Sequence, residues 1–214
     1  MINSDILQNM LIRYPNLAGI KNELSAVCSE IITSLANGGT LFLAGNGGSA
    51  CDCEHLAGEL LKGFCSKRPL DAEMQNKFAD LFGNAGENIA KSLQQGLKCI
   101  SLLSHPGFGS AFANDVDASL IYAQQLLALG KADDVVIGFS TSGNADNICK
   151  LFMTARVLNI KTILFTGKNH GKAEAYADFV INAPESETYK IQELHLPLYH
   201  TLALIIEEHF FGGR

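Results

Sequence analysis

Val135-Val136-Ile137-Gly138-Phe139 is the stretch that decides the fold, because five apolar residues stand together between polar turns. A strand that is buried on both faces shows such a continuous apolar run, as in the centre of a parallel sheet. Four other short apolar runs lie at residues 40–44, 99–103, 162–165 and 179–182, and helical stretches separate them. This alternation is typical of βαβ units. The sequence therefore predicts an α/β fold with a five-stranded parallel sheet.

Helical segments flank and interrupt this core. Residues 1–37 form an N-terminal helical segment, because apolar residues recur there at three- or four-residue steps, and Pro15 divides it in two. We expect these helices to pack on a partner subunit. A helical insertion is expected at 66–98, with helices at 74–81 and 87–97, and a strongly apolar last helix at 189–211. The chain, 1–214, is predicted to form a single domain.

Composition narrows the classes of function. Of the 214 residues, 47% are apolar and 18% are charged, which suits a sizeable core and excludes wholesale disorder. The formal charge of −6 argues against nucleic acid as the main ligand. No apolar run approaches the roughly 18 residues of a membrane span, and the first residues lack a signal-peptide pattern. We therefore expect a cytoplasmic protein that does not bind membranes.

Two loops that follow strands predict a phosphate site. The first, here called the glycine loop, is Gly45-Asn46-Gly47-Gly48-Ser49, and the second, the hydroxyl loop, is Ser140-Thr141-Ser142-Gly143-Asn144. In a parallel sheet such loops meet at the carboxyl ends of the strands, where ligands bind. Free backbone N–H groups and hydroxyls before a helix suit a phosphate monoester that is held but not hydrolysed. The alternatives are an ordinary tight turn for the first loop and an ordinary helix cap for the second.

Two helices carry side chains suited to chemistry. His55 and Glu59 lie four residues apart, which places them on one face of a helix, where they can ligate a metal or transfer a proton. A surface ion pair is the alternative. In the last helix, Gln192, His195 and His200 interrupt an apolar sequence. Such polar groups are costly unless they are satisfied, and for His195 we favour a hydrogen-bonded core position.

Taken in order, these motifs resemble the bacterial phosphoheptose isomerases, which belong to the sugar isomerase (SIS) domain superfamily. The resemblance runs through most of residues 1–65 and 99–211. The hydroxyl loop alone marks only the superfamily. The ordered set is more specific, and it adds His55 with Glu59, Asn114-Asp115-Val116, and Ile191-Gln192-Glu193-Leu194-His195 with His200.

The resemblance implies an SIS fold, a three-layer α-β-α sandwich, and an aldose–ketose isomerase. The implied reaction converts sedoheptulose 7-phosphate into D-glycero-D-manno-heptose 7-phosphate through an enediol, for heptose in lipopolysaccharide or capsule. A homotetramer and one zinc ion per subunit are also implied. By position, the metal ligands would be His55, Glu59, Gln192 and His200. The substrate would contact Asn46, Gly47, Gly48, Ser49, Asn114, Asp115, Ser140, Thr141, Ser142 and Gln192.

The residue types suit this chemistry. Glu59 is the candidate base and His200 the candidate acid for moving a proton between adjacent carbons, and zinc would polarise the carbonyl. A carboxylate on zinc is a weaker base, so Glu59 fills both roles only with difficulty. Gln192 is an uncommon kind of zinc ligand, and its alternative role is a hydrogen bond to the sugar.

Spacing in the last helix bears on how the site is assembled. Eight residues separate Gln192 from His200, a rise of about 12 Å in a straight helix, and Pro197 lies between them. Either the helix breaks near Pro197 or neighbouring subunits contribute to each site. We expect the second, with the last helix of one chain over the loops of another.

Three departures from the family pattern leave alternatives open. Ala145 stands where a serine usually follows the hydroxyl loop, Tyr189 stands where an acidic residue is common, and residues 69–98 are longer than the family norm. That region usually lines the sugar end of the pocket. The alternatives are therefore a non-catalytic SIS module that binds a phosphosugar, and an isomerase of another phosphosugar.

Overall fold

A five-stranded parallel sheet forms the centre of the protein, whose computed structural model describes residues 4–212. The strand order is β2-β1-β3-β4-β5, and every neighbouring pair is parallel. The strands are β1 (Leu41–Gly45), β2 (Cys99–Ser101), β3 (Val135–Phe139), β4 (Lys161–Thr166) and β5 (Phe179–Asn182). The apolar stretch at 135–139 is the central strand β3, and it is buried along its whole length. The predicted α/β fold is confirmed.

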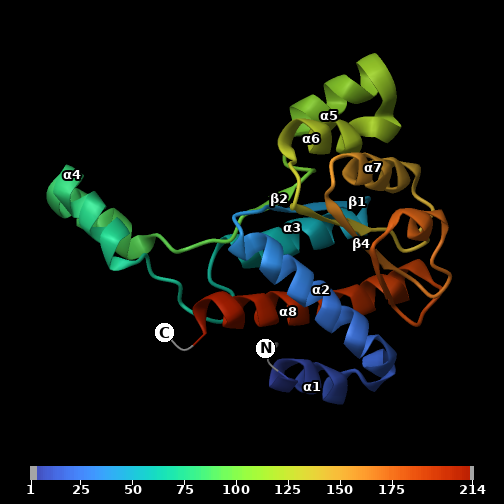
Figure 1. Ribbon diagram of the computed structural model, residues 1–214, viewed down its shortest axis with the longest axis horizontal. Helices are drawn as coiled ribbons and strands as arrows, with labels where there is room; N and C mark the ends of the chain where they lie inside the picture. Colours follow the sequence, from blue (N-terminus) through green and yellow to red (C-terminus); the bar gives the residue numbers. More distant parts are fainter. Residues whose placement is uncertain (1–3, 213–214) are drawn as a thin grey trace.

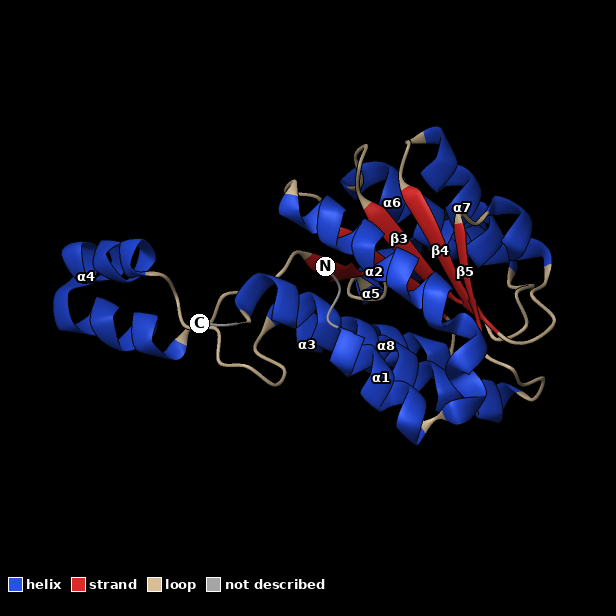
Figure 2. Ribbon diagram, turned by 60° about the horizontal axis from the view of Figure 1, so that its bottom comes forward, coloured by secondary structure: helices blue, strands red, loops and turns tan. Residues whose placement is uncertain are grey.

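Helices cover both faces of this sheet and complete the three-layer sandwich (Figures 1 and 2). Alternate strand residues point to opposite faces, so Leu43 and Ile137 join one apolar core while Phe42 and Val136 join the other. The first face is covered by α1 (Ser4–Arg13), η1 (Pro15–Ile20), α2 (Lys21–Ala36), α3 (Gly48–Leu61) and α8 (Thr188–Phe211). The second is covered mainly by α6 (Ile121–Leu129), α7 (Asp146–Val157) and η4 (Lys172–Tyr176).

The N-terminal helices α1 and α2 pack against α8 of their own chain. Their apolar residues, including Leu17, Leu24 and Ile31, are fully buried there. Packing of the same segment on a partner subunit stays a prediction. Within residues 4–212 no helix is both long enough and apolar enough to cross a membrane.

Helix α4 (Ala72–Ser92) projects from the body as an arm (Figures 1 and 2). Gly83 has a φ of 55° and a ψ of −138°, so the arm is a hairpin of two helical halves that turn back at this residue. The Asp71 carboxylate caps the first half by accepting from the Met74 N–H at 2.8 Å. The sugar end of the family's pocket is usually lined by this part of the chain, whereas here the arm extends away from the body.

A second long connection joins β2 to α6. It consists of α5 (Pro106–Phe112), the π-helical segment η2 (Ala113–Asp117) and the short η3 (Ala118–Leu120). Figure 1 shows it near α6 and α7, on the face of the sheet opposite to α8.

Helix α8 continues without a break from residue 188 to residue 211, although it contains Pro197. Proline removes one backbone donor, so the Glu193 carbonyl one turn earlier loses its usual partner, yet the helix continues. The Thr201 hydroxyl donates to the Pro197 carbonyl at 2.7 Å. A break at this proline is therefore not how the chain arranges Gln192 and His200.

Candidate active site

The glycine loop and the hydroxyl loop meet at the carboxyl ends of β1 and β3, as predicted. Two carboxamides join them: Asn46 donates to Asn147 at 3.0 Å, and Asn147 donates back to Asn46 at 2.8 Å. The Tyr122 hydroxyl donates to the Gly45 carbonyl at 2.6 Å and fixes the end of β1. Asn147 and Tyr122 were not identified from the sequence, because nothing in their local pattern indicates a partner about a hundred or about eighty residues away.

Glycine is required at two positions of these loops. A Cβ on Gly48 would come within 2.7 Å of the Gln192 amide nitrogen, so the first turn of α3 lies directly against α8. Gly143 has a φ of 63°, and a side chain there would collide with the backbone of His170. The loop after β4 therefore closes over the hydroxyl loop, and the Lys172 N–H donates to Asn144 at 3.1 Å.

A small cavity of about 150 Å³ lies between the hydroxyl loop and the turn after β4. Thr141 and Ser142 of the hydroxyl loop line it, together with Lys168 and Asn169 from the turn after β4. Hydroxyls, an ammonium group and backbone N–H groups are suitable donors for one phosphate. The Glu185 carboxylate also lines the cavity and opposes an anion at that side. Lys168 is a residue that the sequence did not assign, because its strand-to-turn pattern indicates only an α/β fold.

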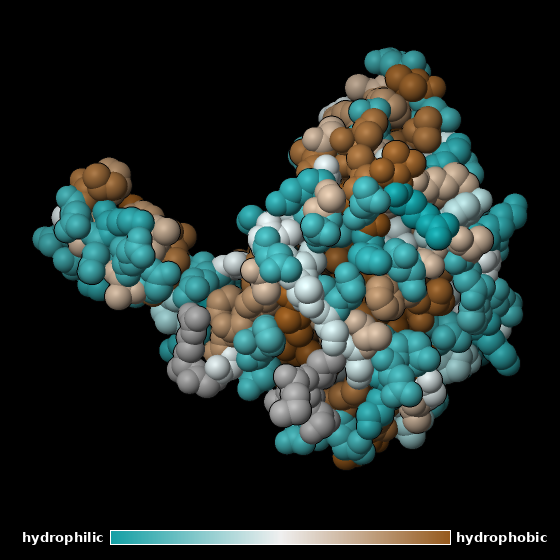
Figure 3. All heavy atoms as spheres, viewed as in Figure 1, coloured by the Kyte–Doolittle hydropathy of each residue, from teal (hydrophilic) through white to brown (hydrophobic). Residues whose placement is uncertain are grey.

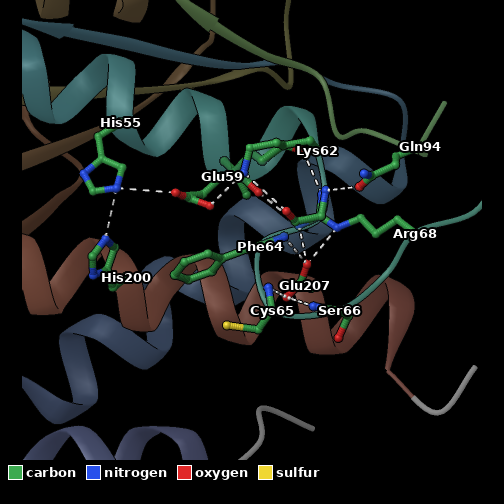
Figure 4. Close-up of polar contacts among 12 residues, drawn as sticks. His55, Glu59, Lys62, Phe64, Cys65, Ser66, Arg68, Gln94, His200 and Glu207 are labelled. Carbon is green, nitrogen blue, oxygen red and sulfur yellow. Dashed lines mark hydrogen bonds and ion pairs between the residues drawn. The ribbon is translucent and has the colours of Figure 1, made fainter. Parts of the chain in front are cut away.

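His55, Glu59 and His200 come together in one chain, two turns farther along α3 and α8 (Figure 4). The His55 Nε2 atom lies 3.4 Å from Glu59 Oε1 and 3.4 Å from His200 Nε2. Lys62 Nζ lies 3.5 Å from the other Glu59 oxygen. The expectation that α8 of a neighbouring chain supplies His200 is not needed, since α8 brings it to His55 within the same chain.

These three side chains are partly accessible. The His55 side chain is 45% exposed and that of Glu59 is 15% exposed. Partial burial, the nearby His55 and the Arg13 charge lower the pKa of His200, and Glu59 opposes them. His200 is therefore a neutral imidazole at neutral pH.

A buried tyrosine supports this cluster from α8. The Tyr199 hydroxyl lies 3.0 Å from His55 Nδ1 and donates to Asp52 Oδ1 at 3.3 Å. Sequence reasoning assigned neither residue, because Tyr199 fits the apolar pattern of the last helix. The available signal was Asp52 itself, a carboxylate three residues before His55.

A second polar cluster lies farther along the same two helices (Figure 4). The buried Arg68 side chain forms an ion pair with Glu207 at 2.8 Å and donates to the carbonyls of Leu60 and Glu59 at 2.9 and 3.0 Å. The Glu207 oxygens also accept from backbone N–H groups of Phe64, Cys65 and Ser66. This pair anchors the loop that follows α3. Its sequence signal was Glu207 itself, which directly follows an apolar run of the last helix.

The remaining predicted residues lie apart from the cluster. Gln192 lies against Gly48, at the loop end of α8. Asn114 and Asp115 are exposed on η2, where Asn114 donates to Asp115 at 2.9 Å. His195 is fully buried and its Nε2 lies 3.2 Å from the Thr166 carbonyl, so the core interpretation fits. Across residues 4–212, no group of three or more His, Cys, Asp or Glu side chains forms a ready metal site.

Comparison with known proteins identifies the family. The SIS domain family model matches residues 110–206. The phosphoheptose isomerase of Burkholderia pseudomallei is 33% identical over 88% of this chain and 82% of its own length, and that of Helicobacter pylori is 31% identical over 98% and 96%. The structure of the Francisella tularensis phosphoheptose isomerase has a TM-score of 0.75 at 25% identity, with 92% of this chain and 91% of that chain covered. The Neisseria gonorrhoeae enzyme has a TM-score of 0.69 at 27% identity, with 88% and 87% covered. The chain therefore belongs to the phosphoheptose isomerase family.

Proposed function

We propose that this isomerase converts sedoheptulose 7-phosphate into D-glycero-D-manno-heptose 7-phosphate through an enediol. One observation carries the proposal: a phosphate-sized cavity lies at Ile191, near the start of α8, and an imidazole–carboxylate cluster lies farther along the same helix at His200. From Ile191 to His200, α8 rises about 14 Å. That rise is comparable with the length of an open-chain heptose phosphate, so one ligand can reach both ends.

At the loop end, the hydroxyl loop and Lys168 would hold the phosphate, and Gln192 and Asn46 would contact the sugar. Nothing there is placed to attack phosphorus, and a cavity that only holds the phosphate fixes the sugar's position. Positioning of this kind converts binding energy into rate, because the reacting carbons are held beside the catalytic groups.

At the other end, Glu59 would remove a proton from the hydroxyl-bearing carbon and return it to the neighbouring carbonyl carbon, while the proton of that hydroxyl moves to the carbonyl oxygen. His200 would donate a hydrogen bond to the carbonyl oxygen, where negative charge develops. A neutral imidazole is a suitable donor here, because the lowered pKa of His200 keeps it uncharged before the reaction. The Lys62 ammonium lies 3.5 Å from Glu59 Oε2.

The residue types also suit one zinc ion per subunit, although within residues 4–212 they do not form a ready site in this structure. Two imidazoles and a carboxylate are a common zinc set, and donor atoms on one tetrahedral zinc lie about 3.4 Å apart. The two distances from His55 Nε2 equal this value. His55, Glu59 and His200 would hold the ion, whereas Gln192 lies at the glycine loop. A bound zinc would polarise the substrate carbonyl as a Lewis acid.

The proposal also covers the use of the product, the location of the enzyme and its oligomeric state. The product would supply heptose for lipopolysaccharide or capsule in the cytoplasm, and the enzyme would be a homotetramer. The N-terminal helices are the surface proposed to meet a partner subunit.

The test is a direct assay with sedoheptulose 7-phosphate, with and without added Zn²⁺. The wild-type protein should form the aldose product, and Glu59→Gln should lower kcat by about 10²- to 10⁴-fold. Glu73→Gln, on the exposed arm, is the matched control and should leave kcat unchanged. Absence of turnover by the wild-type protein under both conditions contradicts the proposal.

An isomerase of another phosphosugar is the second candidate, favoured by two departures near the loops. Ala145 precedes α7 without any side-chain cap, and Tyr189 is 59% exposed beside the cavity wall. A panel of ketose phosphates of five to seven carbons separates the candidates by kcat/KM. A protein that binds these sugars but turns over none would instead be a non-catalytic binding module.

A further inference from the structure

A buried tyrosine hydroxyl joins His55 to a carboxylate that the proposed chemistry does not use. Tyr199 is 1% exposed, and its ring meets Phe139 edge-on at 6.1 Å, so the hydroxyl cannot easily move. This hydroxyl lies 3.0 Å from His55 Nδ1 and 3.3 Å from Asp52 Oδ1. The His55 side chain, in contrast, is 45% exposed.

The Asp52 carboxylate is poorly satisfied for a group in this position. Its Oδ2 atom is buried without a hydrogen-bond partner, so among the described residues Tyr199 provides its hydrogen bond. Burial raises the pKa of Asp52, while the Tyr199 hydrogen bond and His55 oppose that shift. Such an arrangement costs stability and contributes little to packing. We therefore look for its effect in His55, the second residue that the Tyr199 hydroxyl contacts.

Counting hydrogens gives the direction of this chain of contacts. A tyrosine hydroxyl has one proton to donate, and an ionised carboxylate can only accept. The hydroxyl proton therefore goes to Asp52, and the phenol oxygen accepts from the protonated Nδ1 of His55. A neutral His55 then has no proton on Nε2, the atom that faces Glu59 and His200.

We propose that Asp52 and Tyr199 are positioning residues that hold His55 as its Nδ1-protonated tautomer, with the Nε2 lone pair turned toward His200. This chain of contacts from Asp52 through Tyr199 to His55, here called the relay, rests on the hydrogen bonds. Only its use in catalysis rests on the proposed function. Without a metal ion, it gives the two facing Nε2 atoms complementary roles: that of His55 accepts, and that of His200 carries a proton that a metal ion would displace. The same lone pair is the one that a metal ion would need.

The tautomer can be read directly from nitrogen chemical shifts. The full chain, labelled with ¹⁵N-histidine and treated with EDTA, is compared at neutral pH with Tyr199→Phe, and His55→Gln assigns the signal. In the wild-type protein Nδ1 of His55 should be protonated and Nε2 should not. Tyr199→Phe should abolish this preference, whereas the control Tyr176→Phe, at the far side of the sheet, should retain it. A wild-type His55 protonated on Nε2, or an unchanged tautomer in Tyr199→Phe, overturns the proposal.

Binding of Co²⁺ provides a second readout that does not depend on turnover. Loss of a group that orients a ligating histidine weakens metal binding by about 10- to 100-fold, and we expect this for Tyr199→Phe. Asp52→Asn keeps the size of the side chain and an acceptor oxygen, so its effect should be smaller. Urea unfolding verifies that each variant is folded. If the tautomer is as expected but no heptose phosphate is converted, the proposed function fails and the relay stands. If the heptose phosphate is converted but His55 is protonated on Nε2, the proposed function stands and the positioning role of Tyr199 and Asp52 fails.

Discussion

Two polar clusters beside helix α8 differ in how completely their hydrogen-bonding groups are satisfied (Figure 4). One lies between α8 and α3, and the other lies between α8 and the loop that follows α3. In the Arg68–Glu207 cluster both side chains are almost fully buried, and each Glu207 oxygen accepts at least two hydrogen bonds. In the cluster of His55, Glu59 and His200 the closest contacts are 3.4 Å long and the groups reach solvent.

The difference distinguishes the carboxylate of Glu207, which has a structural role, from that of Glu59, which can still accept a hydrogen bond from a ligand. Glu207 has no lone pair left for a ligand, so its charge serves only to hold the loop after α3. Glu59 retains acceptor capacity on both oxygens, because neither has a short hydrogen bond. Arg68 links the two clusters, since it also donates to the Glu59 carbonyl. The saturated cluster therefore holds the backbone on which the unsaturated one is built.

The largest effect should come from breaking the saturated cluster. Glu207→Ala leaves a buried guanidinium and three backbone N–H groups without their acceptor. Loss of one partner from a buried ion pair costs about 3–5 kcal/mol in the free energy of unfolding. Urea unfolding followed by circular dichroism measures it. A cost below about 1 kcal/mol would show that the two clusters do not differ in this way.

His200→Gln should give the opposite profile. We expect kcat to fall by about 10²-fold or more, because the donor to the carbonyl oxygen is lost. The free energy of unfolding should change by less than about 1 kcal/mol, since the side chain is only partly buried. Steady-state kinetics and urea unfolding of one preparation test both statements. Large losses of both kcat and stability would make His200 a structural residue.

Acid should affect the two clusters in separate pH ranges. The pKa of His200 is lowered, so its contribution to stability is complete above its ordinary pKa of 6.5 and is lost as the pH falls through the lowered value. Burial alone would raise the pKa of Glu207, but three backbone N–H groups and Arg68 outweigh it and lower the pKa. That contribution is lost only below 4.5. His200→Gln should reduce the first decline in unfolding free energy but not abolish it, because burial also lowers the pKa of His195, to about 4. Glu207→Gln should flatten the second decline, and its loss of unfolding free energy at neutral pH should be smaller than that of Glu207→Ala.

The smallest change in the free energy of unfolding is expected for an exposed ion pair, and it serves as the reference for the others. Lys77 and Glu73 form an exposed pair on the arm at 2.6 Å. Exposed pairs contribute little, so Lys77→Met should change the free energy of unfolding by less than about 0.5 kcal/mol. A larger loss in the same urea assay would mean that short distance, rather than burial, determines how much an ion pair stabilises this protein.

The parts that sequence reasoning could reach are those with a local signal. Continuous apolar runs such as 135–139 reflect burial on both faces, and they located all five strands. Glycines at positions 48 and 143 reflect backbone demands, and they located both loops. Partnerships between distant residues have no such signal: Glu207 and Arg68 lie 139 residues apart, and Tyr199 resembles any core residue of α8.

The spacing argument for the last helix shows a related limit. Eight residues of one unbroken helix separate Gln192 from His200, a rise of about 12 Å, and whether the two residues share an ion stays a prediction. The choice of a neighbouring chain to resolve it was unnecessary for His200, because α3 runs beside α8 within the same chain. The geometry between two packed helices, which no periodicity reveals, decides which side chains meet.

The arm formed by α4 joins the body through a narrow neck. Pro69 pairs with Gln94, and the Gln95 N–H donates to the Arg68 carbonyl at 2.7 Å, so its two ends lie side by side. A longer or shorter segment between Pro69 and Gln94, or its removal, would leave the distance between these two residues unchanged. Insertions of different size are therefore tolerated at this point of the chain, and a tag or a second domain placed at Gly83 would leave the sheet and its loops undisturbed.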